Sequence, residues 1–251
     1  MMKHYNYILI TSLLFILTSC GISEDCFKGN GSRITQTFPL ENFTKIKVYD
    51  GVGLVIKEGP TYDVTIKTSD NIIDNLDVEV KEGMLIVKDN STCNLARDYG
   101  QTIVYVTTPN LEEIHCKTDQ DIKSDGVLTY PNLKLFSMDL SDGAGTGDFY
   151  LEVVSDFIYV ESNNVSNFTI SGNTFDMNVF FAWGNGKFNG TNLTVTNTLS
   201  FFHRGSNDMT FFPTKSLIGN IYSTGDVIIK NQPLENPNVV EFSLGRLILD
   251  Y

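Results

Sequence analysis

A column of turn carboxylates is the feature of this sequence best suited to chemistry. Four aspartates share one place in a repeated turn: Asp121, Asp148, Asp208 and Asp226. Such a column could bind calcium or supply the acid and base of a polysaccharide lyase or glycosidase, and Asp139 and Asp142 lie just upstream of one member. Asn167 and Lys187 occupy the two middle turns, however, and interrupt any ladder of metal ligands. Because Asp and Asn also bond their own backbone in turns, we expect structural turn residues, with no metal and no cofactor.

A thiol–imidazole pair is the second chemistry to consider. His115 and Cys116 are adjacent, and neighbours on a β-strand point to opposite faces. His203 falls four repeats beyond Cys116, on the order of 19 Å away at a strand spacing of about 4.8 Å. The third histidine, His4, lies in a segment that we expect to be removed. Neither pair could share a proton, so we expect no nucleophilic catalysis of this type. Because no acid–base site is found either, we expect a protein that is not an enzyme.

Outward-facing aromatic residues are the more informative feature. Counting alternate positions places Phe181 and Phe202 at one outward site on successive turns. Tyr159 falls two residues earlier on the preceding turn, and Trp183 falls at the adjoining corner. Stacked rings can bind a sugar or another protein, but they can also stabilise the turns by covering one another. These four residues form the candidate contact surface, and a glycan, an envelope protein or a second copy of the chain are the partners left open.

These residues are positioned by a repeat that runs from Lys117 to Asn231. In six segments a small or polar tetrad is followed at once by an apolar residue. The apolar residues are Ile122, Phe149, Phe168, Phe188, Met209 and Val227. The steps between them are 27, 19, 20, 21 and 18 residues. A period near twenty is typical of stacked turns, each too small to bury its own face.

Alternation of apolar and polar residues indicates that the repeated segments are β-strands. Runs such as Phe168-Thr-Ile-Ser and Val227-Ile-Ile-Lys have period two, with the first and third residues facing inward. A leucine-rich repeat would need asparagines at a fixed offset from leucines, and a propeller blade would need about forty residues. We therefore predict an all-β protein, in which a small β head leads into a single-stranded, right-handed β-solenoid with turns of about twenty residues.

The first twenty residues indicate export and a lipid anchor. Lys3 supplies a positive charge, Ile8 to Leu17 form a short apolar core, and Leu17-Thr-Ser-Cys20 resembles the cleavage box of bacterial lipoproteins. So short an apolar stretch suits a signal peptide and not a membrane span. An ordinary signal peptide beside an unrelated cysteine is the alternative. Lipid on Cys20 would hold the protein at a membrane, so we expect a lipid-anchored protein of the cell envelope, at the outer membrane.

The net charge limits the partners of the protein, and turn signals indicate how the rest of the chain is organised. The net charge of −12 argues against nucleic acid as a partner. Asp50-Gly51 and Glu82-Gly83 stand between alternating runs and are hairpin signals. The expected organisation is a signal peptide over 1–19, a tether over 20–32, a β head over 33–107 and a β-solenoid over 108–251.

Short motifs along the chain match a known family. The motifs are Cys26-Phe-Lys-Gly-Asn-Gly-Ser, Phe43-Thr-Lys-Ile-Lys-Val, Glu82-Gly-Met-Leu, Thr92-Cys-Asn-Leu-Ala-Arg and Val106-Thr-Thr-Pro-Asn-Leu. Together they resemble the auto-transporter adhesin, head GIN domain family over roughly residues 27–251. The resemblance implies an envelope lipoprotein with a β-helical body, and it brings no catalytic residues.

The remaining cysteines fit an exported protein. Cys26 and Cys93 lie at the two edges of the predicted head, where disulfide partners are expected. The resemblance supports this pair, because family members carry cysteine at both places; two unrelated thiols are the alternative. Cys116 falls on an inward position and suits a small core residue. The sequence as a whole favours a non-catalytic surface binding or adhesion-type module, with a small β-helical carbohydrate-active enzyme as the alternative.

Overall fold

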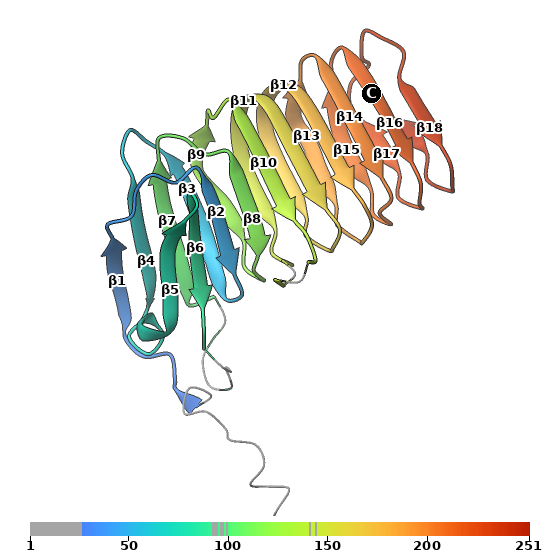
Figure 1. Cartoon of the computed structure of the whole chain (residues 1–251). Helices are drawn as coiled ribbons and strands as arrows, with labels where there is room; N and C mark the ends of the chain where they lie inside the picture. The colour runs from blue at the N-terminus through green and yellow to red at the C-terminus, as the bar shows by residue number, and fades with distance from the viewer. Residues whose placement is uncertain (1–26, 92–94, 96–97, 99, 141, 144) are drawn as a thin grey trace, which may run out of the picture.

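The chain folds into an elongated β-solenoid (Figure 1). The computed structural model describes residues 27–91, 95, 98, 100–140, 142–143 and 145–251. Nineteen strands of this part belong to one sheet, and a single 3-10 turn, Ile73–Asn75, interrupts them. Within these residues no helix is long and apolar enough to cross a membrane. The predicted all-β solenoid is confirmed.

Each turn contributes a strand to each of two parallel ladders. The first ladder contains β2 (Lys45–Tyr49), β8 (Glu113–Lys117), β10 (Asn132–Ser137), β14 (Thr198–His203), β16 (Ser216–Ile221), β18 (Asn238–Glu241) and the second halves of β11 (Phe149–Ser162) and β12 (Phe168–Phe181). The second ladder contains β3 (Val52–Glu58), β9 (Ile122–Leu128), β13 (Phe188–Val195), β15 (Met209–Pro213), β17 (Val227–Ile229), β19 (Leu247–Leu249) and the first halves of β11 and β12.

The strand register confirms the predicted repeat. Ile122 pairs with Phe149, and the column continues turn by turn through Phe168, Phe188, Met209 and Val227. All six side chains are fully buried. The column also reaches one turn further than predicted, because Val227 pairs with Leu247. The repeat of glycine- and asparagine-rich turns in the sequence therefore identified an inward-facing residue in each of the six predicted turns.

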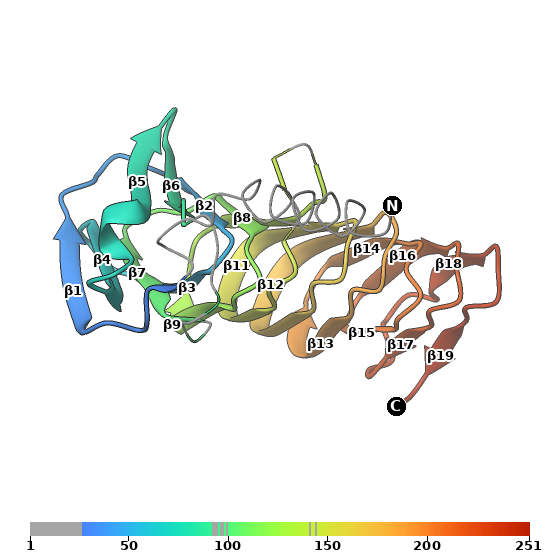
Figure 2. The same ribbon diagram turned by 90° about the horizontal axis from the view of Figure 1, so that it is seen from below.

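The N-terminal end of the solenoid is built differently. Parallel pairing places β6 (Met84–Asp89) beside β2, and β7 (Thr102–Thr108) beside β3, so β6 and β7 form the outermost turn although they follow β2 and β3 in sequence. Antiparallel strands then close this end, which lies opposite β19 (Figure 2). They are β5 (Leu76–Lys81) on β6, β4 (Asp63–Ser69) on β7 and β1 (Arg33–Phe38) on β4. The parallel ladders thus run on into the segment predicted as the head.

Only one of the two predicted hairpins forms. Glu82 and Gly83 join the antiparallel β5 and β6 with φ values of 52° and 73°, as a tight hairpin turn requires. Asp50-Gly51 joins β2 and β3, which pair in parallel with strands of different ladders. The hairpin prediction there is wrong, because a Gly at a φ of 80° suits a solenoid corner as well as a hairpin.

Candidate functional site

The turn aspartates connect successive turns of the solenoid. Asp148 Oδ1 accepts the backbone N–H of Asn167 at 2.9 Å, and Asn167 Oδ1 accepts that of Lys187 at 3.1 Å. The same bond joins Asp208 to the N–H of Asp226 at 3.0 Å. Among the described residues no group of three His, Cys, Asp or Glu side chains is placed to hold a metal ion. Asp148, Asn167 and Asp208 thus have a structural role, but they satisfy backbone donors of the next turn and not those of their own turn, as the sequence had suggested.

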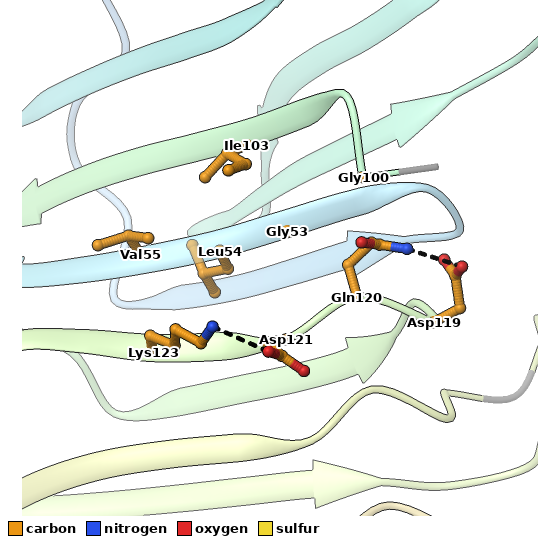
Figure 3. Close-up of a pocket in the computed structure, with 9 residues that line it drawn as sticks. All are labelled: Gly53, Leu54, Val55, Gly100, Ile103, Asp119, Gln120, Asp121 and Lys123. Carbon is orange, nitrogen blue, oxygen red and sulfur yellow. Dashed lines mark hydrogen bonds and ion pairs between the residues drawn. The ribbon is translucent and has the colours of Figure 1, made fainter. Parts of the chain in front are cut away.

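A pocket of about 200 Å³ adjoins the first of these corners (Figure 3). Asp121 there lies 2.9 Å from the ammonium group of Lys123. Gln120 donates to Asp119 at 2.8 Å, and Asp119 also accepts the N–H of Gly51 at 2.9 Å. These hydrogen bonds and this ion pair stabilise the corner. Because the polar groups already have partners, few of them are left to bind a ligand.

The histidines and Cys116 are separated as the alternation predicted. His115 points outward, where its Nε2 lies 3.0 Å from Glu113 Oε2 and its ring stacks on Phe136 with centroids 4.7 Å apart. Cys116 is fully buried and is a free thiol within the described chain; burial raises its pKa to about 11. His203 is fully buried four turns further along the first ladder. Neither of these two imidazoles is therefore paired with the Cys116 thiol.

One residue of the predicted contact surface faces inward. Phe181 is only 1% exposed and pairs in register with buried His203, so its outward assignment was wrong. Its neighbour Phe180 faces outward instead, pairs with Phe202, and stacks on it with centroids 4.6 Å apart. The run Val179-Phe-Phe-Ala182 contains no polar residue, so alternation could not decide which of its positions meet solvent.

The outward rings form a continuous stack, here called the aromatic ladder. It consists of Phe180, Phe202, Tyr222 and Phe242, with centroid distances of 4.6, 4.9 and 4.4 Å. Phe180 and Phe202 are half-buried, whereas Tyr222 is 39% and Phe242 58% exposed. Because neighbouring rings cover one another's faces, the middle of the ladder stabilises the sheet, and only its C-terminal end is open to a partner.

The other two predicted surface residues differ in exposure. Trp183, at the corner that follows β12, is 58% exposed. Tyr159 is half-buried, and its hydroxyl donates to Glu161 at 2.9 Å. Among the predicted surface and the aromatic ladder, the residues more than a third exposed are Trp183, Tyr222 and Phe242, here called the exposed aromatic surface. Sequence analysis identified Trp183 and missed the other two.

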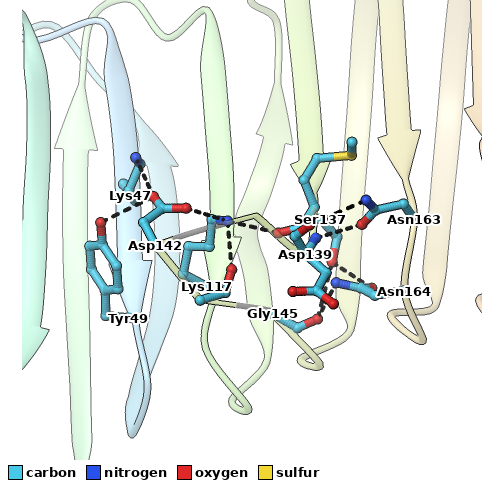
Figure 4. Close-up of polar contacts among 11 residues, drawn as sticks. Lys47, Tyr49, Lys117, Ser137, Asp139, Asp142, Gly145, Asn163 and Asn164 are labelled. Atoms are coloured by element: carbon cyan, nitrogen blue, oxygen red, sulfur yellow. Dashed lines mark hydrogen bonds and ion pairs between the residues drawn. The ribbon is translucent and has the colours of Figure 1, made fainter.

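The longest step of the repeat, between Ile122 and Phe149, contains an additional loop. The loop follows β10 and is anchored on the first ladder by Lys117, which is only 4% exposed (Figure 4). The Lys117 ammonium group donates to the carbonyls of Met138 and Gly143, both at 2.7 Å, and contacts Asp142 at 2.7 Å. All three of its hydrogens are thereby used, which compensates the burial of its charge.

Asp142 connects this loop to the preceding turn. Its Oδ2 lies 3.1 Å from the ammonium group of Lys47 and accepts from the hydroxyl of Tyr49 at 3.4 Å. Burial acts to raise the pKa of Asp142, but hydrogen bonds and charge from Lys117 and Lys47 lower it to about 2. Asp142 is thus a carboxylate at neutral pH. Sequence analysis missed this cluster, although the 27-residue step was a visible signal of an insertion.

Three predicted site residues lie outside the described residues. They are Cys20, the expected lipidation site, and Cys26 and Cys93, the expected disulfide partners. The anchor and the disulfide stay predictions.

Comparison with known proteins identifies the family. Residues 42–233 match the family described as “Putative auto-transporter adhesin, head GIN domain”. A crystal structure of a “putative adhesin” from Bacteroides fragilis has a TM-score of 0.78 and 21% identity, and the match covers 87% of this chain and 97% of that one.

Two structures from Parabacteroides distasonis are also similar. A “putative adhesin” has a TM-score of 0.65 and 14% identity over 89% of this chain and 99% of that one. A “Putative lipid binding protein” has a TM-score of 0.60 and 15% identity over 88% and 98%. At these identities the likeness shows the fold alone, and no curated protein gives a significant match. The extent of the family match decides the classification: this chain belongs to the auto-transporter adhesin, head GIN domain family.

Proposed function

We propose that this protein is a lipid-anchored, non-catalytic binding module of the cell envelope, of the adhesion type. The family description and the adhesin-like structural neighbours support a surface or envelope role. The observation that carries the proposal is the exposed aromatic surface of Trp183, Tyr222 and Phe242. Burying an aromatic ring stabilises a complex by about 1.5–3 kcal/mol, so a partner that covers two of these rings gains several.

The partner is a glycan or an envelope protein. Rings inside the aromatic ladder have no free face, whereas the indole of Trp183 and the end ring of Phe242 are more than half exposed. An open ring face can stack on a sugar, and an exposed ring edge can pack in a protein pocket. Both kinds of contact need the same residues, so one set of variants tests them together.

The test replaces Trp183 and Phe242 by serine in one variant. We expect loss of binding to purified polysaccharides or to solubilised envelope proteins in a pull-down, with an unchanged melting temperature. Phe175→Ser is the matched control, because Phe175 is 54% exposed near the opposite corner of the turn. Unchanged binding by the double variant, or equal loss in the control, would contradict the proposal. Release of new reducing ends or unsaturated sugars by the wild type would contradict its non-catalytic part.

The anchor is tested separately through Cys20. Cys20→Ala should release the protein from the membrane fraction and abolish labelling by radioactive or alkyne-tagged fatty acids. Cys116→Ala should change neither, because Cys116 is a buried core thiol. Membrane association that survives Cys20→Ala would exclude a lipid anchor at this residue.

The proposed disulfide between Cys26 and Cys93 has support from neighbouring segments. Asn30 and Asp98 exchange two hydrogen bonds, of 2.7 and 2.8 Å, and Arg33 donates to the carbonyl of Gln101 at 2.7 Å. These contacts hold Asn30 and Arg33, which follow Cys26 in the sequence, against Asp98 and Gln101, which follow Cys93. Non-reducing peptide mapping should show the two cysteines linked and Cys116 free; a Cys93–Cys116 peptide would refute the pairing. Such a bond typically contributes about 2–4 kcal/mol.

A further inference from the structure

A second, unassigned site lies where the additional loop meets the first ladder. The loop and the outward side chains of the ladder border a half-open cavity of about 330 Å³. This is roughly twice the ~150 Å³ of an engineered cavity that holds benzene, and it falls within the ~300 Å³ and upward of ligand pockets. Insertions in solenoid turns commonly build binding faces, and this is the longest step of the repeat.

The exposed area of the cavity walls is mainly apolar, although four of the eight lining residues are charged: Lys47, Lys117, Asp142 and Glu161. Met138 and Leu140 line it from the loop, and Phe136 and the imidazole of His115 line it from the ladder. The rings of His115 and Phe136 stack at 4.7 Å with an angle of 16°, so they cover each other's faces and leave edges to the cavity. A sugar needs an open ring face, whereas a flexible alkyl chain packs against ring edges and thioether alike. Leu140 is 57% exposed, which a bound chain would reduce.

The surroundings of the cavity are basic in an otherwise acidic protein. Lys45 and Lys134 lie 3.5 and 3.6 Å from the same carboxylate, that of Glu113. Asp142 is likewise shared, by Lys47 and by the buried Lys117. Each of these carboxylates faces two ammonium groups. Lys47, Lys117 and Asp142 line the cavity, whereas Lys45, Lys134 and Glu113 lie beside it, so ammonium groups outnumber carboxylates in and next to the cavity. Such an excess attracts an anionic group.

One acidic residue of the cavity wall lies one turn beyond Phe136, with which it pairs in register. Glu161 lines the cavity from β11, and one of its oxygens is occupied by the hydroxyl of Tyr159. The strand register places Lys45, Glu113 and Lys134 on successive turns, two residues from Lys47, His115 and Phe136. An anionic head is therefore expected at the lysine side, with the apolar body directed under Met138.

We propose that this cavity binds the alkyl chain of a single-chain anionic amphiphile, with the anionic head at the Lys45 and Lys134 side. A free fatty acid and a lysophospholipid share this chemistry. The proposal does not use the exposed aromatic surface. Trp183 lies one turn beyond Glu161, Tyr222 and Phe242 lie further towards the C-terminus, and none of the three lines the cavity, so each proposal can fail without the other.

The experiment uses the full-length chain with Cys20→Ser, so that no attached acyl chain competes, and methyl-13C methionine. The sequence has six methionines, and Met138→Leu assigns the signal of interest. Decanoate, added below its micelle concentration, should shift the Met138 methyl signal saturably and give nuclear Overhauser contacts to it. Decanol and decyltrimethylammonium share the alkyl chain but lack the anionic head group. Their affinity should be lower than that of decanoate by at least about five-fold. Decanoyl-lysophosphatidylglycerol represents the lysophospholipid. Comparing its affinity with that of decanoate shows whether the cavity prefers a lysophospholipid or a free fatty acid.

Two pairs of variants locate the site. Met138→Trp, which fills the cavity, should weaken decanoate binding at least about ten-fold. Val165→Trp should not, because Val165 is an exposed residue at the next corner. Lys45→Gln with Lys134→Gln should weaken decanoate and leave decanol unchanged. Lys57→Gln, at an exposed ion pair of the second ladder, is the control for charge.

The outcomes are decisive in each arm. A saturable shift without contacts to the Met138 methyl group in the wild type would overturn the proposal even if Met138→Trp fails to fold. Equal affinity for all three head groups would overturn the anionic part. Absence of binding by every amphiphile would overturn the whole and favour an apolar side chain of a protein partner as the occupant.

Discussion

Phenylalanine occupies both sides of the same sheet, with similar stacking and different burial. Inside, Phe149 and Phe168 stack with centroids 4.5 Å apart and are fully buried. Outside, Phe180 and Phe202 stack at 4.6 Å and stay partly exposed. The spacing between turns therefore imposes ring stacking on either side. The two pairs differ in the area that folding removes from water. This buried area should determine how much each ring contributes to the free energy of unfolding.

The largest predicted effect is inside the solenoid. Phe188→Ala removes a fully buried ring from the column of Phe168 and Met209, and should lower the free energy of unfolding by about 3–5 kcal/mol. The adjacent outward residue provides the control: Asn189→Ala should change it by less than about 0.5 kcal/mol. Urea unfolding measures both. Equal effects would break the distinction between the two sides of the strand.

A polar residue inside the solenoid should make stability depend on pH. His203 is fully buried, and neither ring nitrogen has a hydrogen-bond partner in the described structure. Burial lowers its pKa from 6.5 to about 4, although a weak contact with the backbone of Asn207 and the charges of Asp208 and Asp226 oppose this. The unfolded chain thus binds a proton near pH 6.5, whereas the folded chain binds it only near pH 4. Stability should therefore rise with pH between these values, by up to about 3 kcal/mol, and then level off.

The comparison with His203→Leu isolates this contribution. The acidic residues of the chain titrate in both proteins, so the difference between the two unfolding curves, measured by urea at several pH values from 4 to 7.5, reports on the histidine. The wild type should lose stability relative to His203→Leu as pH falls, because protonation destabilises only the wild type. Parallel curves would show that His203 is not held neutral by its burial.

The outside of the sheet has its own buried anchor. Lys117→Met should remove the three contacts that hold the additional loop and lower the free energy of unfolding by about 1.5–3 kcal/mol, as expected for hydrogen bonds to a charged group. It should also raise the pKa of Asp142 from about 2, which carboxyl-carbon NMR can follow. Lys123→Met is the control, because its pair with Asp121 is half-exposed and should contribute less than about 1 kcal/mol. Similar losses in both variants would deny Lys117 this role.

The repeat was predictable because its signal is local. A turn tetrad followed by an apolar residue recurs wherever a corner meets the inward face, and all six predicted positions pair in register. Alternation failed only at Phe180 and Phe181, where two large apolar residues are adjacent and either could be buried. The side that each takes is set by neighbouring turns, through pairing with Phe202 and His203. That information is absent from the strand itself.

The N-terminal end and the additional loop were less predictable for a different reason. The position of β6 and β7 beyond β2 and β3 is a matter of long-range order, and the same alternating strands would fit either arrangement. The 27-residue step showed that extra chain exists between Ile122 and Phe149. It could not show that Lys117 would hold that chain over Phe136. The turns themselves can be predicted from the sequence, whereas a site formed by contacts between turns can be identified only in the structure.

The smallest predicted effect tests the aromatic ladder directly. Phe202 stacks on both Phe180 and Tyr222, so Phe202→Ser should lower the free energy of unfolding by about 1–2 kcal/mol, from lost stacking and partial burial. Trp183→Ser removes a larger ring that is 58% exposed, and should change stability by less than about 0.5 kcal/mol. The order of these two effects, measured by urea unfolding, is the sharper result, because side-chain size alone predicts the reverse. If Trp183→Ser proved the more damaging, exposure would be a poor guide to which rings support the sheet, and the choice of Trp183 as a contact residue would lose its basis.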